Sequence, residues 1–285
     1  MSTLSFLLAP FIASLILTGI HAYLGVHVVE RGVIFVDLSL AQIAALGTTI
    51  AVLYGIEPHS MTAYWVSLAF TFLGAAVFST IRGKHARIPQ EAVIGICYAV
   101  ASAAAILAMS KSVEQTEHLK EMLVGNILTV SWFEVAKTAV LYSAIGLFHY
   151  IFRHKFLTIS LDQERAEAEG ISVRFWDFMF YASFGFVVTS SVAIAGVLLV
   201  FCYLIVPSVG AMLFAENVGP RLAIGWTMGT LVSALGVYLS LKVDLPTGAT
   251  IVCTFGIVLI AMALLRVLLR HRVAPAAEPV VMSHR

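Results

Sequence analysis

The sequence predicts an all-α, polytopic helical membrane protein with about nine transmembrane helices. Of its 285 residues, 60% are hydrophobic and 12% are charged, and the mean hydropathy is +0.96. A soluble domain carries about 25% charged residues, so most of this surface cannot face water. Several apolar runs reach about 20 residues, the length that a helix needs to cross a bilayer. Such runs are too long for the alternating strands of a membrane barrel and therefore predict helices.

Nine apolar segments are the candidate spans. They comprise residues 5–29, 33–54, 61–81, 92–109, 131–152, 176–193, 195–214, 221–240 and 247–270. The division between the sixth and seventh is the least marked, because only the stretch TSSVAIAG suggests a turn in a continuous apolar run. No linker or low-complexity stretch divides the chain. We therefore expect a single transmembrane domain over residues 1–272 and a short polar tail over residues 273–285.

The basic residues predict the orientation, because Lys and Arg stay on the cytoplasmic side of a membrane. Most of the 17 basic residues lie in residues 82–87, in residues 153–174 and at the end of the last span. Four lysines fall on the other side, namely Lys111, Lys120, Lys137 and Lys242. With an odd number of spans, this distribution places the N-terminus outside and the C-terminus in the cytoplasm.

Composition and motifs argue against several classes of protein. The formal net charge is +1, so bulk charge indicates no nucleic-acid partner. The sequence has no GxxxxGK[ST] phosphate-binding loop, no HExxH and no GxSxG. We therefore expect no enzyme activity, no catalytic residues and no cofactor bound by this chain. The three cysteines stand singly in apolar runs, and we interpret them as packing residues.

The longest polar connection contains a short predicted helix. The stretch LDQERAEAEGI is acidic and rich in helix-forming residues. Gly170 is expected to end this helix, because glycine adopts left-handed backbone angles without strain. On the residues alone, such a segment is most often a solvated surface helix between two spans.

Six blocks of the sequence, in the right order, resemble the zinc/manganese (ABC-3) branch of bacterial ABC importer permeases. They are LGVHVVERGVIFVDLSLAQIAALG, IPQEAVIGICYAVASA, MLVGNILTVSW, ISLDQERAEAEGI, AIAGVLLVFCYLIVPSVGAML and LGVYLSLKVDLPTGATIV. Within the fourth block, ERAEAEG is similar to the Glu-Ala-Ala-x-x-x-Gly loop of such permeases, with Arg165 as the one departure. This resemblance implies that Glu164, Ala166 and Gly170 couple the permease to its ATPase through a short docking helix.

The same resemblance implies the partners and the setting of a permease domain. It implies a homodimer with a second permease copy, two copies of a separate ABC ATPase subunit that binds ATP, and a periplasmic or lipoprotein metal-binding protein. The assembly would lie in the lipid bilayer of the bacterial cytoplasmic (inner) membrane. Its transported cargo would be a divalent metal, either zinc or manganese/iron.

Asp37 is the one carboxylate that lies within a predicted span rather than at its edge. An intramembrane charge costs a few kcal/mol, so its retention suggests a function or a partner. One interpretation is structural: Asp37 pairs with Arg31 or caps the start of its helix. The other places it in an ion path. The family usually carries Asp-x-x-x-His in this span, and aligning RGVIFVDLSLAQ on it puts Leu38 and Gln42 at those two positions.

His21 is a partial replacement for the missing ligands. Counted from the cytoplasmic ends of the first two spans, His21 and Asp37 lie at similar depth. We therefore expect a carboxylate–imidazole pair or a shared ligand set for a divalent metal. The commoner alternative for His21 is a histidine bonded to a backbone carbonyl. Gln42 would add a carbonyl oxygen to the substrate path, where weak binding suits rapid release.

These patterns predict the membrane-spanning permease subunit of an ATP-driven divalent-metal importer that works by alternating access. Two alternatives stay open. One is a proton-coupled secondary transporter in which Asp37 and His21 relay protons. The other is an ABC importer of a metal chelate or another small solute, for which the missing ligand pair leaves room.

Overall fold

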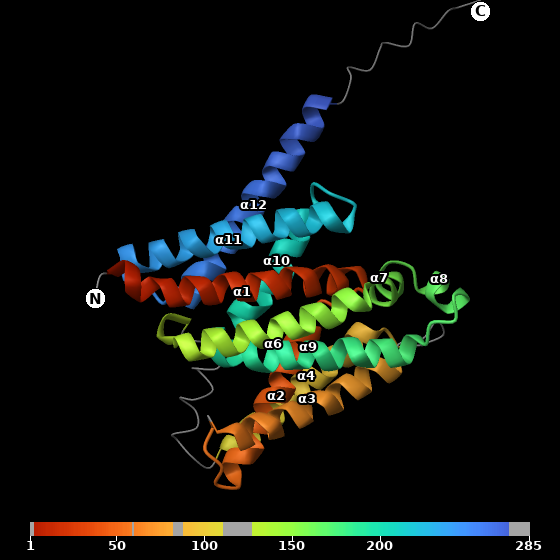
Figure 1. Cartoon of the computed structure of the whole chain (residues 1–285), viewed down its shortest axis with the longest axis vertical. Helices are drawn as coiled ribbons and strands as arrows, with labels where there is room; N and C mark the ends of the chain where they lie inside the picture. The colour runs from red at the N-terminus through yellow and green to blue at the C-terminus, as the bar shows by residue number, and fades with distance from the viewer. Residues whose placement is uncertain (1–2, 59, 82–87, 111–126, 274–285) are drawn as a thin grey trace, which may run out of the picture.

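The computed structural model describes residues 3–58, 60–81, 88–110 and 127–273, and all secondary structure in these ranges is helical. Figure 1 shows the helices packed side by side, which confirms the predicted all-α class. In chain order the elements are α1 (Thr3–Glu30), α2 (Val36–Leu53), α3 (Met61–Ile81), α4 (Gln90–Met109), the 3-10 turn η1 (Ile127–Thr129), α6 (Trp132–Ile151), α7 (Arg153–Leu161), α8 (Gln163–Ala168), α9 (Val173–Ala195), α10 (Val197–Met212), α11 (Val218–Val243) and α12 (Thr247–Val273).

Each predicted span corresponds to one of these helices, but their lengths reduce the count. Seven of the described helices are long and apolar enough to cross a membrane, and the pair α6–α7, bent by 75°, raises this number to at most eight. The seventh predicted segment, residues 195–214, forms α10, which has 16 residues and is about 24 Å long. That is short for a hydrocarbon core of about 30 Å. The prediction of about nine spans is therefore slightly too high.

The weakly marked division between the sixth and seventh predicted segments lies at Gly196. This residue separates α9 from α10 and has φ 76° and ψ 160°. Only glycine adopts this backbone conformation readily. The glycine of the TSSVAIAG stretch therefore breaks an apolar run that would otherwise continue as one helix.

The helices form two groups that α9 joins. On one side, α2 packs against α3 and α4, and on the other, α1 packs against α10 and α11, with α12 outside them. Helix α9 contacts α3, α2 and α10. Of the long apolar helices that the structure describes it is the most buried, with 72% of its most apolar stretch inside the protein. The least enclosed spans are α12 and α4, at 17% and 22%. Their apolar side chains are left facing a lipid or protein neighbour.

The path of the chain places its two ends at opposite ends of the bundle. Glu30 closes α1 and forms an ion pair with Arg221 near the start of α11, so these helix ends meet. Helix α11 has 26 residues and returns over about 39 Å to the end where α1 begins. Helix α12 then runs back toward the end that carries α7 and α8. Of the predicted tail over residues 273–285, Val273 is the last residue of α12, and residues 274–285 lie outside the described residues. Residues 82–87, Lys111 and Lys120 also lie outside them.

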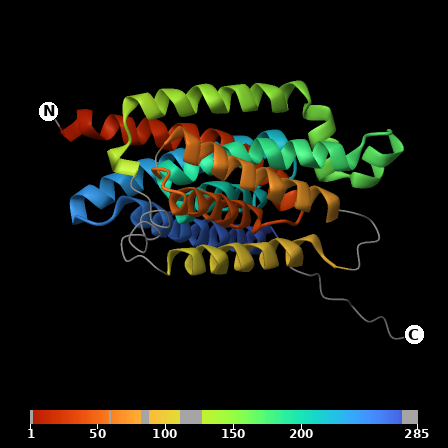
Figure 2. The same cartoon turned by 90° about the horizontal axis from the view of Figure 1, so that it is seen from below.

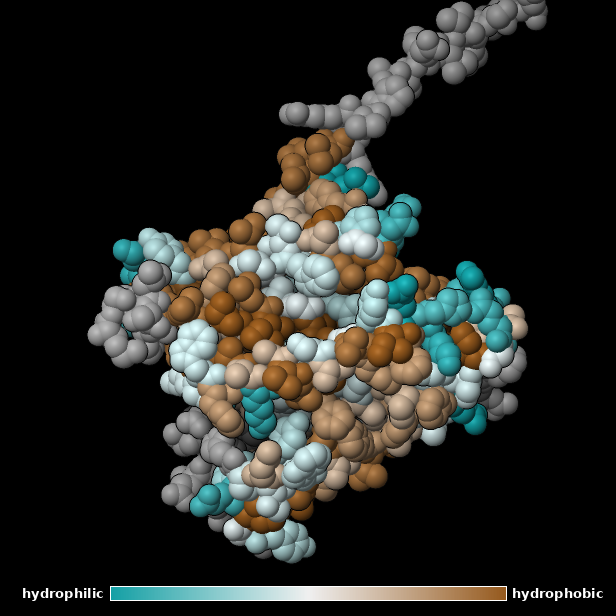
Figure 3. Space-filling model, viewed as in Figure 1, coloured by the Kyte–Doolittle hydropathy of each residue, from teal (hydrophilic) through white to brown (hydrophobic). Residues whose placement is uncertain are grey.

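The surface agrees with a bilayer setting. Hydrophobic residues cover much of the middle of the face in Figure 3, and a group of hydrophilic residues lies over α7 and α8. Large apolar side chains are exposed along α12, among them Ile257, Ile260, Leu264 and Leu268. This pattern suits a multi-pass membrane protein whose α8 end projects from the membrane.

Candidate functional site

The predicted coupling helix forms as α8, and its sequence fixes both of its ends. The Asp162 carboxylate caps the start by accepting a hydrogen bond of 2.9 Å from the Arg165 N–H. Gly170 follows the helix with φ 72°, and the Ile171 N–H bonds to the Ala166 carbonyl at 2.9 Å. This is the Schellman arrangement, which ends a helix on a left-handed glycine. A helix of only six residues is held in shape by these two caps.

The three predicted coupling residues do not all face outward. Glu164 and Gly170 are exposed, whereas Ala166 is completely buried and belongs to the apolar core of the protein. The small side chain of Ala166 therefore lets α8 lie close to its own spans. The exposed small residue of α8 is Ala168, which the sequence reasoning did not select.

The outer side of α8 presents acidic and amide groups. Arg165 bonds to Glu169 one turn later at 2.8 Å, and Gln163 bonds to Glu167 at 3.1 Å. The segment protrudes at the end of the molecule opposite the N-terminus (Figure 1 and Figure 2). A capped, protruding and acidic helix of this kind can insert into a groove of a partner protein.

Asp37 neither caps the start of its helix nor pairs with Arg31, the two structural roles that the sequence suggested for it. It lies in the first turn of α2, but the residue at the cap position is Phe35, and no side chain caps that helix. Arg31 pairs with Asp177 instead, at 2.8 Å. Asp37 is 1% exposed, and among the described residues its Oδ1 has no hydrogen-bond partner. A buried carboxylate oxygen without a donor is costly, which marks Asp37 as a functional candidate.

His21 is buried and bonded within the protein. Its Nδ1 lies 2.8 Å from the Leu17 carbonyl, and its Nε2 lies 3.3 Å from the Ser191 hydroxyl. A carbonyl only accepts, so Nδ1 carries the proton and Nε2 keeps its lone pair, while the nearby Ser191 hydroxyl donates to the Val187 carbonyl at 2.6 Å. The commoner alternative for His21 is therefore the one that the structure has. In the described part of the chain, both ring nitrogens of His21 thus face groups other than the Asp37 carboxylate, and a ligand set shared with Asp37 stays a prediction.

Tyr142 of α6 is a further neighbour of His21. Its ring packs edge-on against His21, with 6.3 Å between the ring centroids. Its hydroxyl contacts Ser191, the same residue that faces His21 Nε2.

Gln42 is buried, at 8% exposed, but lies on another side of α2 from Asp37. Five positions along a helix rotate a side chain by about 140°. Throughout the part of the chain that the structure describes, no three His, Cys, Asp or Glu residues are grouped so that they could hold a metal ion. In this conformation the candidate pathway residues are separate contacts and do not form one coordination sphere.

A second buried charge, which the sequence analysis did not identify, lies near the start of α9. Asp177 has a fully buried side chain, as does its partner Arg31, which lies 146 positions earlier. The signal was present, because Asp177 falls just inside the predicted span of residues 176–193. Its partner could not be inferred, because the pairing depends on how α1 and α9 pack.

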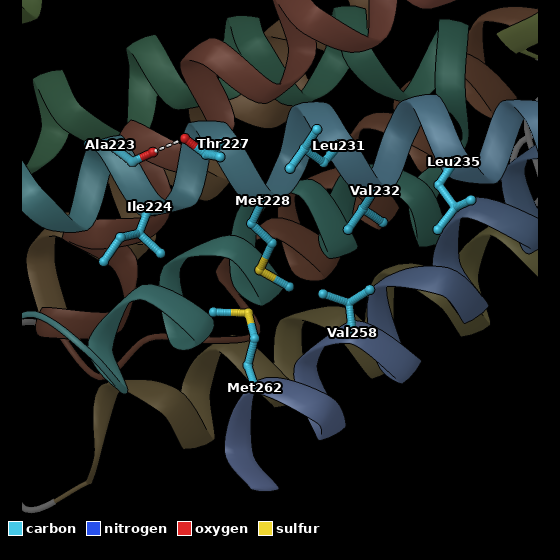
Figure 4. A pocket seen from close by; sticks show the side chains of 9 residues that line it. All are labelled: Ala223, Ile224, Thr227, Met228, Leu231, Val232, Leu235, Val258 and Met262. Atoms are coloured by element: carbon cyan, nitrogen blue, oxygen red, sulfur yellow. Dashed lines mark hydrogen bonds between the residues drawn. The ribbon is translucent and has the colours of Figure 1, made fainter. Parts of the chain in front are cut away.

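The apolar groove of Figure 4 lies between α11 and α12 and encloses about 540 Å³. Its only polar side chain is Thr227, whose hydroxyl donates to the Ala223 carbonyl of its own helix at 2.8 Å. Among its lining residues the groove thus offers no carboxylate, imidazole or thiolate, the ligands that bind zinc, manganese or iron. It is lined by Ala223, Ile224, Thr227, Met228, Leu231, Val232, Leu235, Val258 and Met262.

The chain is similar to known transport proteins along almost its whole length. It is 24% identical over 258 residues to the manganese transport system membrane protein MntC of Listeria monocytogenes, covering 89% of this chain and 88% of the relative. It is 26% identical over 266 residues to a probable iron transport system membrane protein of Haemophilus influenzae, covering 92% and 95%.

Solved structures share the fold. PsaBC from Streptococcus pneumoniae, in complex with Fab, matches with a TM-score of 0.75 and 23% identity over 90% of each chain. An inward-facing metal-chelate type ABC transporter matches with a TM-score of 0.68 and 20% identity over 90% of this chain and 85% of that one. The model of the ABC 3 transport family matches residues 3–266, and with its helical spans this chain is a membrane permease that belongs to that family.

Proposed function

We propose that this chain is the permease subunit of an ATP-driven importer of a divalent metal ion, namely zinc, manganese or iron. The proposal is supported by the names of its relatives, which are manganese and iron transport system membrane proteins. ATP would be bound and hydrolysed on a separate subunit, and the metal would be cargo. Transport would proceed by alternating access.

The observation that carries the proposal is the geometry of α8. The helix is capped at both ends, protrudes from the bundle, and presents Glu164 and Gly170 on its surface. A secondary transporter needs no such docking element, so α8 favours an ATPase-driven mechanism over a proton-coupled one. ATPase movements would reach the spans through this helix.

The ion path in this proposal includes Asp37, with His21 and Gln42 as further contacts. The Asp37 carboxylate is buried with an unpartnered oxygen, so a cation passing along α2 would be attracted to it. His21 holds an imidazole lone pair on Nε2, and Gln42 holds an amide oxygen. Separate and weak contacts suit an ion in transit, since tight binding would slow its release.

The assembly proposed here has further parts. A second copy of the permease would form a homodimer, two ATPase copies would bind the α8 end, and a periplasmic or lipoprotein metal-binding protein would deliver the ion at the other end. The α8 end would face the cytoplasm of a bacterial cell, with the N-terminus outside. The positive-inside rule supports this orientation.

A metal chelate is the second candidate cargo, and one specific observation favours it. Leu38 and Gln42 stand where the family usually carries an aspartate and a histidine. A chelated metal already has its coordination sphere filled, so its transporter would not need that ligand pair. The fold of the metal-chelate type transporter noted above is compatible with this candidate.

Uptake of free and chelated metal separates the candidates and tests the function. The permease would be co-expressed with its ATPase and binding protein in cells that lack their own metal importers. We expect ATP-dependent uptake of radiolabelled zinc, manganese or iron. Uptake of a metal only as its chelate would favour the second candidate, and uptake that persists without the ATPase would contradict the proposal.

A further inference from the structure

A buried polar cluster joins three helices at the α8 end of the bundle. Its members are His27 of α1, Arg31 directly after α1, Ser160 of α7 and Asp177 of α9, and we call it the Arg31 cluster. His27, Ser160 and Asp177 are at most 6% exposed, and the Arg31 side chain is fully enclosed. These residues are far apart in sequence, so the cluster exists only in the folded protein.

Ser160 is the centre of this cluster, and its hydrogen-bonding capacity is filled. Its hydroxyl donates to the Phe156 carbonyl at 2.9 Å and accepts from Arg31 Nε at 2.8 Å. His27 Nδ1 lies 2.8 Å away on the same oxygen. A serine oxygen has one proton and two acceptor positions, so His27 occupies the second acceptor position as a donor.

Arg31 holds the other side of the cluster. One terminal nitrogen donates to Asp177 Oδ1 at 2.8 Å, while the guanidinium lies over the Phe180 ring, 3.9 Å from its centroid. The same planar group thus bonds to α7 and α9, while the Arg31 backbone directly follows α1 and its N–H bonds to the His27 carbonyl. Its orientation is fixed by two hydrogen bonds in different directions and by the ring, which leaves little freedom for one helix to move alone.

The cluster sits next to the coupling helix. Ser160 lies two positions before Asp162, whose carboxylate caps α8, and α7 packs against α8. From His27 the contacts continue to the Tyr23 ring at 4.8 Å, and the Tyr23 hydroxyl lies 3.3 Å from His149 of α6. A displacement of α8 therefore acts directly on a polar network that spans α1, α6, α7 and α9.

We propose that Arg31 is a positioning residue that transmits the movement of α8 to α1 and α9 through Ser160 and Asp177. This inference rests on the proposed function, because it requires that an ATPase moves α8. Coupling between distant sites is carried by packed and hydrogen-bonded groups whose arrangement both sites influence. The Arg31 cluster is such a group, and it lies between the docking helix and the span that follows it.

If Arg31 transmits this movement, position 31 needs a planar guanidinium and not only a positive charge. Lysine keeps the positive charge but presents one compact ammonium group, which cannot reproduce the two separate bonds of the planar guanidinium. Arg31→Lys should therefore leave a folded permease that binds its ATPase but transmits its movement poorly. Ser160→Ala removes the shared oxygen and should give the same defect without changing any charge.

The experiment measures three quantities on the permease–ATPase complex in proteoliposomes: assembly of the complex, ATP hydrolysis, and transport of the metal delivered by its binding protein. For Arg31→Lys and Ser160→Ala we expect normal assembly and ATP hydrolysis within about twofold of wild type. Transport per ATP should fall at least about tenfold. The matched control is Arg221→Lys, because the Arg221 guanidinium at this end bonds to Glu30 of α1 and to the Ala215 carbonyl instead. Its transport per ATP should stay unchanged.

The outcomes separate this inference from the function on which it rests. A wild-type complex that neither assembles nor transports metal would overturn the proposed function, and the inference with it. If wild type transports and both variants keep its ratio of transport to ATP hydrolysis, the inference alone is wrong. A parallel loss of assembly, hydrolysis and transport in Ser160→Ala would also overturn it, because the cluster would then serve only stability.

Discussion

At the scale of single residues, the burial of Asp37 could be predicted from the sequence, whereas its neighbours could not. A carboxylate inside an apolar run is visible from composition alone, because burying such a group is costly. Its surroundings depend on helix packing. Equal depth suggested His21 as its partner, but α1 packs on α10 and α11 while α2 packs on α3 and α4, so the two side chains belong to different helix groups.

The first prediction concerns Asp37→Asn, which removes the charge and keeps the shape. If Asp37 attracts the cation, metal uptake should fall at least about tenfold, equivalent to about 1.4 kcal/mol at the limiting step. The unfolding temperature should not fall, because Asp37 Oδ1 has no hydrogen bond to lose to any residue that the structure describes. Uptake of radiolabelled metal at matched expression and thermal unfolding in detergent check the two parts.

The control for this change is Asp244→Asn. Asp244 is exposed and has φ 55°, a left-handed conformation that asparagine also tolerates. Its uptake should match wild type. Normal uptake in Asp37→Asn would return Asp37 to a structural role and leave the ion path without a carboxylate.

At the scale of elements, the sequence predicted helices well and their functional faces poorly. The ranges of most spans agree with the structure within a few residues, because apolar runs end at polar or glycine-containing stretches. Helix α8 was also predicted from its composition and from Gly170. The inward position of Ala166 was not, because six residues are too few to define which side of a helix packs on the protein.

The second prediction tests the coupling role of α8 through Gly170→Val. A branched residue at φ 72° costs about 1–2 kcal/mol locally, so the end of α8 should change shape. We expect loss of metal uptake and weaker binding of the ATPase in a pull-down. Gly55→Val is the matched control, since Gly55 has φ 78°, is exposed, and lies in the turn after α2 at the other end. Equal loss of uptake in both variants would mean a general folding defect.

The third prediction concerns the packing of α1 against α10. A Cβ on Gly25 would overlap the Leu204 carbonyl and the Ser208 hydroxyl, whereas a Cβ on Gly19 of the same helix would meet nothing within 4 Å. Gly25→Ala should destabilise the fold by about 3 kcal/mol, because one backbone must move. Gly19→Ala should be neutral or slightly stabilising. Thermal unfolding in detergent compares them, and equal unfolding temperatures would show that α1 and α10 are not so close.

At the scale of the whole molecule, charge distribution and chain path support the same orientation by independent routes. The basic residues predict that residues 153–174 and the end of the last span face the cytoplasm. In the structure, the Glu30–Arg221 pair brings the start of α11 to the α8 end, and α11 and α12 then carry the chain away and back. The side on which the α8 end lies follows from the charges and not from the exact number of full spans, so the orientation stays a prediction although nine is slightly too many.

The last prediction follows from this agreement. A green fluorescent protein fused after residue 273 should fluoresce, since it folds only in the cytoplasm, and alkaline phosphatase fused there should be inactive, since it needs the oxidising periplasm. Phosphatase inserted in the α2–α3 turn, next to Glu57, should be active, because that turn lies one span away from the α8 end. The reverse pattern would place α8 outside the cell, where no ATPase can reach it, and would contradict the orientation and the coupling mechanism together.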